Sequence, residues 1–215
     1  GCHYVDLTYF ITGLKPTGVS VHGVKGAFPN GNVGYMWSQG RVLFENDAVL
    51  SVINGLGYPD DAAGPNEQGL IIYCEGEGKT GVFEHNDQFR GVSHSYMDRI
   101  GSGGTVFNYI NPDFYQLGPW AGPGYKPMGY GYDSVAANLE AIGRVRSETE
   151  GLDKTAALAR RQQIIAEIDE KRLIATPANS SINELVTEAA RMSILSDGDF
   201  VKIVYDGSPH IEPKG

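Results

Sequence analysis

Short apolar runs separated by glycines fill the first half of the chain, and amphipathic helices fill the last third. The 29 glycines lie between runs such as TGVSVHGVKGAF and RVLFENDAVLSVI, whose alternation is typical of β-strands. Residues 17–110 are therefore predicted to be strands joined by short turns, which implies antiparallel pairing. Strands followed by helices favour packing of the helices on one sheet face. The predicted fold class is α+β: a large, mostly antiparallel open sheet with helices packed on one face.

A first helix is predicted at the N-terminus from apolar periodicity. Gly13 is placed to end it, since glycine adopts the left-handed conformation that closes many helices. Its apolar face, with Leu7, Phe10 and Ile11, is expected to be buried. The residues at helical spacing are Tyr4, Leu7, Phe10, Ile11 and Leu14.

Three more helices are predicted in the last third of the chain. The first carries an apolar stripe of Val135, Leu139, Ile142 and Val145 and stops near Gly151. The second covers residues 152–174 and is more charged. The third is predicted to have a capping box of Ser181 and Glu184 and a C-cap at Gly198. One face of this helix is expected to carry Ile182, Leu185, Val186, Ala189, Ala190 and Ser193.

The composition of the chain indicates which classes of partner are unsuited to it and in which cellular compartment it is expected. The formal net charge of −9 argues against a nucleic-acid or membrane partner, because both attract basic surfaces. No apolar run approaches the roughly 20 residues of a membrane-spanning helix. Cys2 and Cys74 alone do not make a disulfide framework. A reducing compartment follows, and a cytoplasmic location is predicted.

The stretch CEGEGKTG, residues 74–81, has the glycine spacing of a dinucleotide-binding fingerprint. That fingerprint needs a helix after the third glycine, with its N-terminal amides facing the pyrophosphate. Here Val82 and Phe83 follow Gly81, and both favour a strand. The segment Glu77-Gly78-Lys79 is therefore interpreted as a hairpin turn, and no cofactor-binding residue is predicted in these 215 residues.

A second stretch, EHNDQFRGVSHSYMD, contains two histidines and several carboxylates. His85, Asp87, His94 and Asp98 are ligand types that bind metals. No i, i+4 histidine pair is present, and strand alternation splits neighbouring residues between two faces. A polar strand face is the preferred interpretation, and no metal site is predicted.

Residues 101–131 are rich in glycine, proline and aromatic residues, and irregular structure is predicted there. The aromatic side chains suit a sugar-stacking surface, a cover over the sheet or a subunit interface, and the last two are preferred. The residues considered for these roles are a tyrosine cluster and one tryptophan: Tyr109, Tyr115, Trp120, Tyr125, Tyr130 and, just beyond the segment, Tyr132.

His3 lies at the start of the first predicted helix. The positive end of a helix dipole favours a neutral imidazole, which can accept a proton near pH 7. A capping or simply exposed histidine is an equally good interpretation from the residues alone.

Three segments together resemble the C-terminal domain of the Gfo/Idh/MocA oxidoreductases, the family of glucose–fructose oxidoreductase and inositol dehydrogenase. They are GCHYVDLTYFITGLKPTGV, KPMGYGYDSVAANLEAIGRV and IATPANSSINELVTEAARMSIL. In the first, Gly1, His3 and Asp6 match the end of the family pattern D-x-G-x-H-x-x-D. The resemblance covers nearly the whole chain and marks residues 1–215 as one C-terminal substrate-binding and oligomerisation domain, with the N-terminal Rossmann domain absent from this sequence.

The resemblance implies a full-length enzyme that uses NAD or NADP to oxidise or reduce a sugar, inositol or related polyol. His3 would be the catalytic histidine, and Asp6 would lie near the substrate. Tyr58, Asp60 and Asn66 are candidate substrate contacts, because they lie in a polar loop between predicted strands. The isolated chain is expected to be inactive and to bind no cofactor. The partners implied are the small-molecule substrate, the N-terminal domain and a second copy, in a homo-dimer or homo-tetramer.

Two alternatives remain. Relatives with the same fold use the cofactor transiently for glycoside hydrolysis. The chain could instead be a standalone carbohydrate-binding or scaffolding module with the aromatic segment as its binding face.

Overall fold

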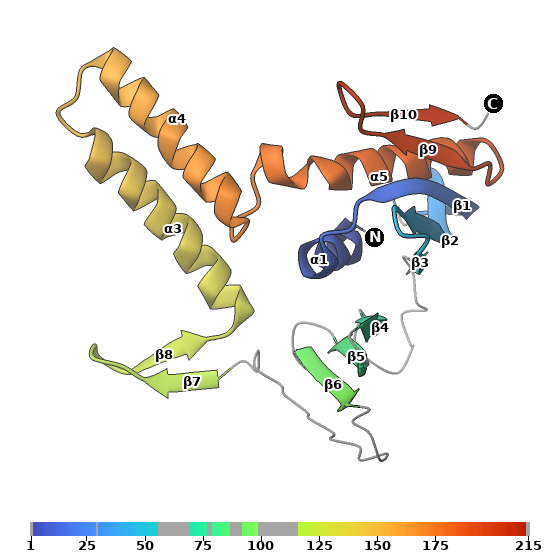
Figure 1. The fold of residues 1–215 in the computed structure, drawn as a ribbon, viewed down its shortest axis with the longest axis horizontal. Helices are drawn as coiled ribbons and strands as arrows, with labels where there is room; N and C mark the ends of the chain where they lie inside the picture. The colour runs from blue at the N-terminus through green and yellow to red at the C-terminus, as the bar shows by residue number, and fades with distance from the viewer. Residues whose placement is uncertain are drawn as a thin grey trace. The chain divides into compact units, whose positions relative to one another are not determined.

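The larger sheet has five antiparallel strands in the spatial order β10-β9-β1-β2-β3 (Figure 1). The strands are β1 (Pro16–Ala27), β2 (Val33–Phe44), β3 (Val49–Gly55), β9 (Val201–Val204) and β10 (His210–Pro213). The polar turn Glu45–Asp47 joins β2 to β3, and Asp47 adopts a left-handed conformation with φ 66°. The α+β class and the antiparallel pairing are confirmed.

The computed structural model describes residues 2–28, 30–55, 69–76, 79–86, 92–98 and 116–213. The chain divides into two compact units. The first comprises Gly1–Gly64 and Ala175–Gly215 and holds the five-stranded sheet. The second comprises Pro65–Ile174. None of the helices in the described residues combines the length and apolar character needed to cross a membrane.

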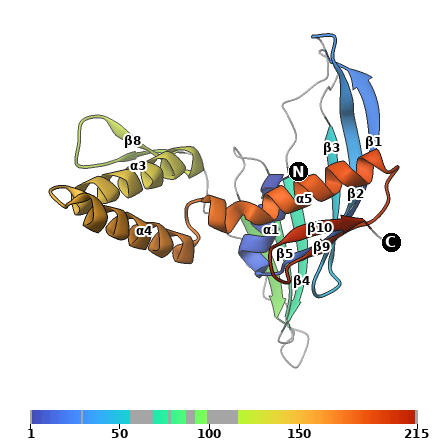
Figure 2. The same ribbon diagram turned by 90° about the horizontal axis from the view of Figure 1, so that it is seen from above.

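Helices α1 (Cys2–Thr12) and α5 (Pro177–Leu195) form the core of the first unit with the sheet (Figure 2). Strand alternation turns Val19, Val21 and Val42 toward these helices, and all three are buried. The predicted apolar face of α5 is confirmed, with Ile182, Val186, Ala189 and Ser193 buried and Leu185 and Ala190 partly buried. The opposite face of the sheet exposes Val24, Trp37, Val49 and Ile53.

Ser193 is a buried polar residue in this core. Its hydroxyl accepts a hydrogen bond from the Val21 amide at 2.9 Å and donates to the Asp199 carbonyl at 2.6 Å. A buried hydroxyl is tolerated when its bonds are satisfied. The hydrogen bond between Ser193 and Val21 therefore links α5 to the middle of β1.

The N-terminal end of α5 differs from the prediction. The capping box is formed by Thr176 and Asn179, and Pro177 takes the first helical position. The fixed φ of proline suits that position, so the helix begins before Ser181. Ser181 instead lies within the helix, and its predicted cap is wrong.

The C-terminal end of α5 also differs. Ser196 is the C-cap, and Gly198 lies two residues beyond it, where its amide donates to the Ser193 carbonyl at 2.8 Å. This is the longer-range hydrogen bond of a Schellman ending.

Helix α1 buries a different face from the one predicted. Val5 and Thr8 are buried, whereas Phe10 is 58% exposed and Ile11 is 39% exposed. The Thr8 hydroxyl donates to the Tyr4 carbonyl at 2.7 Å, which satisfies it inside the core. Gly13 ends the helix with φ 72°, as predicted.

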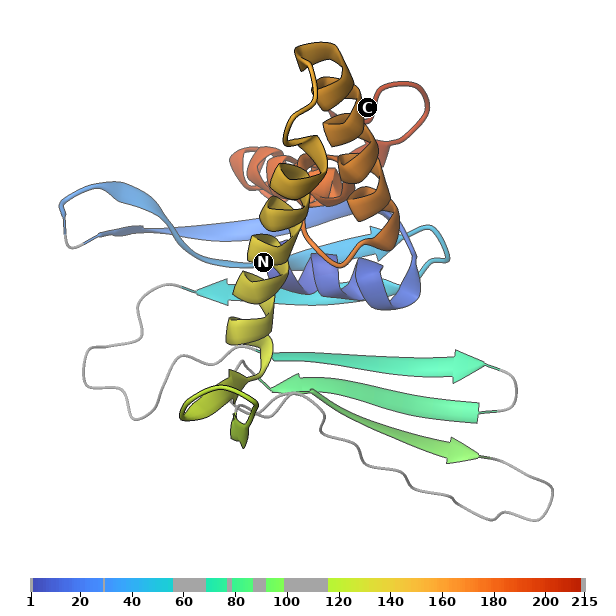
Figure 3. The same ribbon diagram turned by 90° about the vertical axis from the view of Figure 1, so that its left-hand side faces the viewer.

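The second unit contains two smaller sheets and a helical hairpin (Figure 3). Strands β4 (Gly69–Gly76), β5 (Lys79–Asn86) and β6 (Val92–Asp98) pair antiparallel, as do β7 (Gln116–Pro119) and β8 (Tyr125–Met128). Helix α3 (Tyr130–Thr149) packs against α4 (Lys154–Lys171). The irregular structure predicted for residues 101–131 is wrong for 116–128. Pro119 and Pro127 are compatible with this two-stranded ladder because each strand pairs on one side only.

Candidate functional site

The first turn of α1 carries His3, whose side chain is exposed. Asp6 follows three residues later, so both side chains lie on one face of the helix. Phe10 lies seven residues after His3, on the same face. This face therefore combines a titratable imidazole, a carboxylate and an exposed apolar side chain.

Asp6 is held in place by α5. The Asn183 side-chain amide donates a hydrogen bond to Asp6 Oδ1 at 3.0 Å. Asn183 Oδ1 is buried and accepts no hydrogen bond within the described part of the chain. The sequence does not reveal Asn183, because no local pattern links it to Asp6, 177 residues away.

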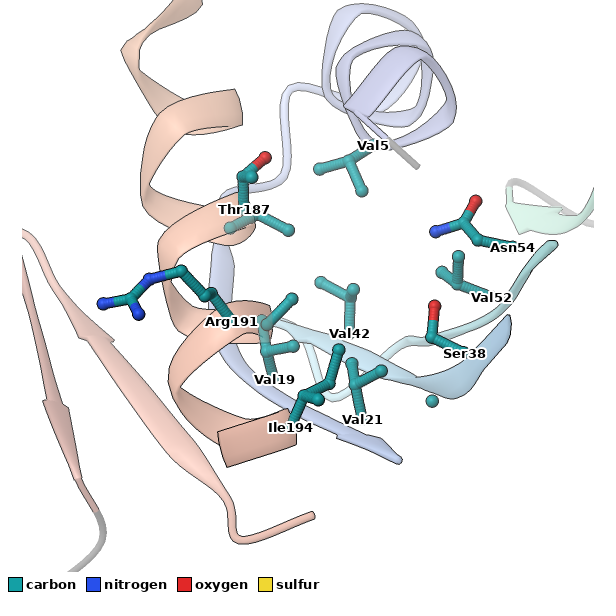
Figure 4. A pocket seen from close by; sticks show the side chains of 13 residues that line it. Val5, Val19, Val21, Ser38, Val42, Val52, Asn54, Thr187, Arg191 and Ile194 are labelled. Carbon is teal, nitrogen blue, oxygen red and sulfur yellow. The ribbon is translucent and has the colours of Figure 1, made fainter. Parts of the chain in front are cut away.

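A pocket of about 360 Å³ lies between α1, α5 and the sheet (Figure 4). Val19, Val21 and Val42 line it from the sheet, and Val5 lines it from α1. Val5 is two residues from His3, which places their side chains on opposite faces of the helix. The pocket and the His3 face are therefore separate features.

The lining of this pocket is mainly apolar. Ser38, Asn54 and Thr187 supply side-chain oxygens and an amide at its margin. Arg191 also borders it, but its guanidinium points away from the valines and makes two hydrogen bonds to Glu188, at 2.9 and 2.7 Å. A polyol needs many polar partners, so this pocket suits an apolar group better than a sugar.

Three other residues were predicted to contact the substrate, and their positions relative to His3 are not described. Tyr58, Asp60 and Asn66 lie outside the described residues. Their predicted role stays a prediction.

The glycine-rich stretch lies on two antiparallel strands that pair with each other, and the predicted turn residues Glu77 and Gly78 lie outside the described residues. Gly76 pairs with Lys79, and Cys74 pairs with Gly81, so both glycines lie in an antiparallel ladder. Strand β5 runs from Lys79 to Asn86, so the residues that directly follow Gly81 form a strand and not a helix. The geometry of a dinucleotide-binding turn is therefore not formed by these residues.

The histidine- and carboxylate-containing segment spans β5 and β6. The backbone register places His85 opposite Val92 and Phe83 opposite His94, while Asp87 lies outside the described residues. In the parts of the chain that the structure describes, no three His, Cys, Asp or Glu side chains gather in a way that could hold a metal ion.

Comparison with solved structures gives matches over most of this chain. One is a provisionally assigned oxidoreductase from Thermotoga maritima, with 15% sequence identity and a TM-score of 0.54. Another is an aldose-aldose oxidoreductase from Caulobacter crescentus complexed with glycerol, with 12% identity and a TM-score of 0.47. Each match covers 94% of this chain and 45% of the other, so the chain spans less than half the length of either protein.

In comparisons of sequence, no family model and no curated protein matches the chain. At 15% identity, the match to the Thermotoga maritima protein shows a shared fold: these 215 residues have the architecture of a part of that larger protein.

Proposed function

We propose that this chain is the substrate-side domain of an NAD(P)-dependent oxidoreductase that acts on a sugar, inositol or related polyol. The observation that carries the proposal is the position of the exposed His3 in the first turn of α1, on the same face of the helix as the partly buried Asp6. By its resemblance to the Gfo/Idh/MocA family, this position is expected to hold the histidine that accepts or donates the substrate hydroxyl proton.

The chemistry assigned to this chain is proton transfer. Oxidation of a carbinol releases the hydroxyl proton, which the His3 imidazole would accept, and reduction returns it. Asp6, three residues further along α1, is close enough to orient the imidazole or a substrate hydroxyl. The hydrogen bond from Asn183 limits the rotamers open to Asp6 and so keeps its carboxylate on this face.

The glycine-rich stretch does not have the geometry of a nicotinamide-binding turn. The one stretch with a dinucleotide-like glycine spacing is a hairpin between β4 and β5. In this proposal the cofactor, which carries the hydride, binds to another part of the full-length protein. NAD and NADP are equally compatible with the present chain.

Exposed apolar side chains on the same helix as His3 suit contact with another domain. Phe10 and Ile11 are exposed on α1, and adjacent exposed apolar side chains often mark contact surfaces. We assign this face to contact with the cofactor-binding domain, which would enclose His3 and exclude water from the substrate.

The shared fold supports the proposal without defining the substrate. The Thermotoga maritima protein of similar fold is named as an oxidoreductase, and the present chain matches a part of it. Within this proposal, the exposed sheet face with Val24, Trp37, Val49 and Ile53 mediates a homo-dimer or contributes to a homo-tetramer.

One observation favours a second candidate, a carbohydrate-binding module. Trp120 is 52% exposed and Tyr125 is 69% exposed on the β7–β8 hairpin. The Trp120 indole donates to the Pro123 carbonyl at 3.2 Å and covers Gly122, which leaves one ring face for a ligand. Calorimetric titration of the 215-residue chain with sugars distinguishes the candidates, since millimolar or tighter binding by this chain alone supports the module.

The proposed function is tested by incubating the full-length protein with NAD or NADP and a panel of polyols and aldoses. Substrate-dependent change in nicotinamide absorbance is expected. Product analysis of glycosides in the same reactions separates oxidoreduction from NAD-dependent hydrolysis. Release of a free sugar without net cofactor turnover would favour the hydrolase.

A further inference from the structure

The pocket between α1, α5 and the sheet is large enough to hold a small molecule. Its volume of about 360 Å³ lies within the range of ligand sites, and an apolar cavity of about 150 Å³ is enough to take up benzene. The pocket belongs to the first unit and is separate from the His3 face. A molecule bound there would therefore be distinct from the polyol proposed to react at His3.

The interior of the pocket is made of buried apolar side chains. Val5 lies on α1, Val186 lies on α5, and Val19 and Val42 lie on neighbouring strands of the sheet. All four are buried, so apolar groups surround the interior on three sides. Because removal of apolar surface from water favours binding, this interior suits the apolar part of a ligand.

Gly40 leaves part of the pocket floor without a side chain. It pairs with Val21 on β1 and with Val52 on β3, and both valines line the pocket. A Cβ atom at Gly40 would come within 2.3 Å of the Ser20 carbonyl oxygen, so the close approach of β1 and β2 requires glycine here. The space between the two valines is therefore fixed by the packing of the backbone.

Polar side chains lie at the mouth of the pocket. Ser38 and Asn54 are paired across β2 and β3, and Thr187 of α5 lies on the other side of the pocket (Figure 4). Asn54 and Thr187 are exposed and Ser38 is partly buried, whereas Val19 and Val42 are buried. The lining therefore changes from apolar inside to polar at the solvent.

The hydrogen-bonding groups at this mouth are available to a ligand. Within the described part of the chain, the side chains of Ser38, Asn54 and Thr187 form no hydrogen bond with another residue. Thr187 differs in this from Thr8 and Thr149, whose hydroxyls donate to the carbonyl four residues earlier in their helices. The three side chains together offer donors and acceptors to one hydroxyl or carboxamide group.

The charges at the pocket favour a neutral ligand. Among the described residues that line it, Arg191 is the charged one, and its guanidinium makes two hydrogen bonds to Glu188. This ion pair leaves the described lining without an unpaired charge for a carboxylate, a phosphate or an amine. Since burial of an unpaired charge is costly, an ionised ligand would bind poorly.

We propose that this pocket binds an uncharged amphipathic small molecule. Its apolar body, a single aromatic ring or a branched aliphatic group, lies among the valines. Its head, a hydroxyl or carboxamide group, forms hydrogen bonds with Ser38, Asn54 and Thr187. The proposal does not depend on the enzymatic function, because none of these residues belongs to the His3 face.

Methyl NMR of the 215-residue chain tests the proposal, with benzamide as the probe. Benzamide combines one aromatic ring with a neutral carboxamide. It is expected to shift the methyl signals of Val19, Val42 and Val52 and to saturate with a dissociation constant on the order of 1 mM, as befits a ligand of few atoms.

Matched compounds test the predicted neutrality and apolar character of the ligand. Benzoate has the size and shape of benzamide but carries a negative charge, and it is expected to bind at least about tenfold more weakly. Addition of myo-inositol should leave the valine methyl signals unchanged, because a polyol has no apolar body to place among them.

Ala190→Leu tests the position of the ligand. Ala190 lines the pocket from α5, so a larger side chain there occupies part of the volume, and benzamide should bind at least about tenfold more weakly. Ala136→Leu is the matched control, because Ala136 lies on α3 in the second unit. Circular dichroism checks that both variants are folded.

Asn54→Leu tests the polar mouth with little risk to folding, since Asn54 is exposed. The affinity for benzamide should fall about threefold to tenfold, the usual effect of losing one hydrogen bond. Toluene, which has no head group, should bind the wild type and the variant alike. Equal benzamide affinities in the two proteins would contradict the contact assigned to Asn54.

The proposal is overturned if benzamide leaves the valine methyl signals unchanged at the limit of its solubility, because another segment or a partner would then fill the pocket in solution. It is also overturned if benzoate or myo-inositol binds there as tightly as benzamide, or if Ala190→Leu binds benzamide like the wild type.

Discussion

Asn183 on α5 donates a hydrogen bond to Asp6 on α1 at 3.0 Å, and this bond joins the two helices that pack on the sheet. Asp6 is one turn from His3, so a contact in the C-terminal third of the chain positions a carboxylate beside the N-terminal candidate base. The site proposed here depends on this long-range contact as well as on the residues of α1.

Asn183→Leu should destabilise the first unit by about 1–2 kcal/mol, because it removes a hydrogen bond to a partly buried carboxylate. Asn138→Leu is the control, since the exposed Asn138 amide donates a hydrogen bond to the Ser134 carbonyl of its own helix. Urea unfolding measures both variants. Equal losses at the two positions would show that the bond to Asp6 has no special importance.

Ser193→Ala should cost about 1–3 kcal/mol, since it leaves the Val21 amide without its buried hydroxyl partner. The exposed Ser147, whose hydroxyl donates to the Arg144 carbonyl, gives a control substitution with an expected effect near zero. The comparison is made by chemical denaturation, and an unchanged midpoint for Ser193→Ala would contradict the proposed attachment of α5 to β1.

Thr176→Ala should lower stability by about 1 kcal/mol, because Thr176 caps α5. Ser181→Ala, at the position that the sequence suggested as the cap, should have little effect. Thermal unfolding of the two variants decides between the two caps, and a larger loss for Ser181→Ala would favour the original prediction.

Acid should weaken the helical hairpin of α3 and α4. Arg144 and Arg160 both contact Glu148 and Glu167. Hydrogen bonds from Arg144 and Arg160 hold the pKa of Glu148 below its usual value, and the bond from Arg144 does the same for the pKa of Glu167. Because these pKa values are lowered on folding, the stabilisation is present above the ordinary glutamate pKa and is lost as pH falls through the lowered values.

Glu148→Gln tests this pH dependence. The variant should melt below the wild type near neutral pH, and the difference should shrink as acid protonates the wild-type carboxyls. Glu140→Gln, at an exposed position of the same helix, is the control. A difference that stays constant from neutral to acid pH would show that the ion pairs do not contribute.

The sequence was sufficient to predict the structure of those elements whose local residue pattern agrees with their tertiary packing. Alternation of apolar residues predicted the strands of the β1–β2–β3 ladder. Two β-forming residues after Gly81 were enough to distinguish a hairpin from a nucleotide loop. Helix α5 buried its predicted face because its apolar spacing is regular along its length.

The sequence was insufficient where two local patterns compete or where a contact is distant. Both Thr176–Asn179 and Ser181–Glu184 fit a capping box, and Pro177 favours the first. On α1, apolar residues surround the helix, and Thr8 can be buried because the Tyr4 carbonyl satisfies its hydroxyl. The Asn183–Asp6 bond has no local signal at all.

The role of His3 is tested most directly by the activity of the full-length protein. His3→Asn should lower kcat/KM for the polyol by about 10²–10⁴-fold, the usual contribution of a general base, while cofactor binding stays unchanged. His210→Asn, at an exposed position in the β9–β10 hairpin, should retain full activity. Unchanged turnover by His3→Asn, on a substrate that the wild type oxidises, would contradict the account.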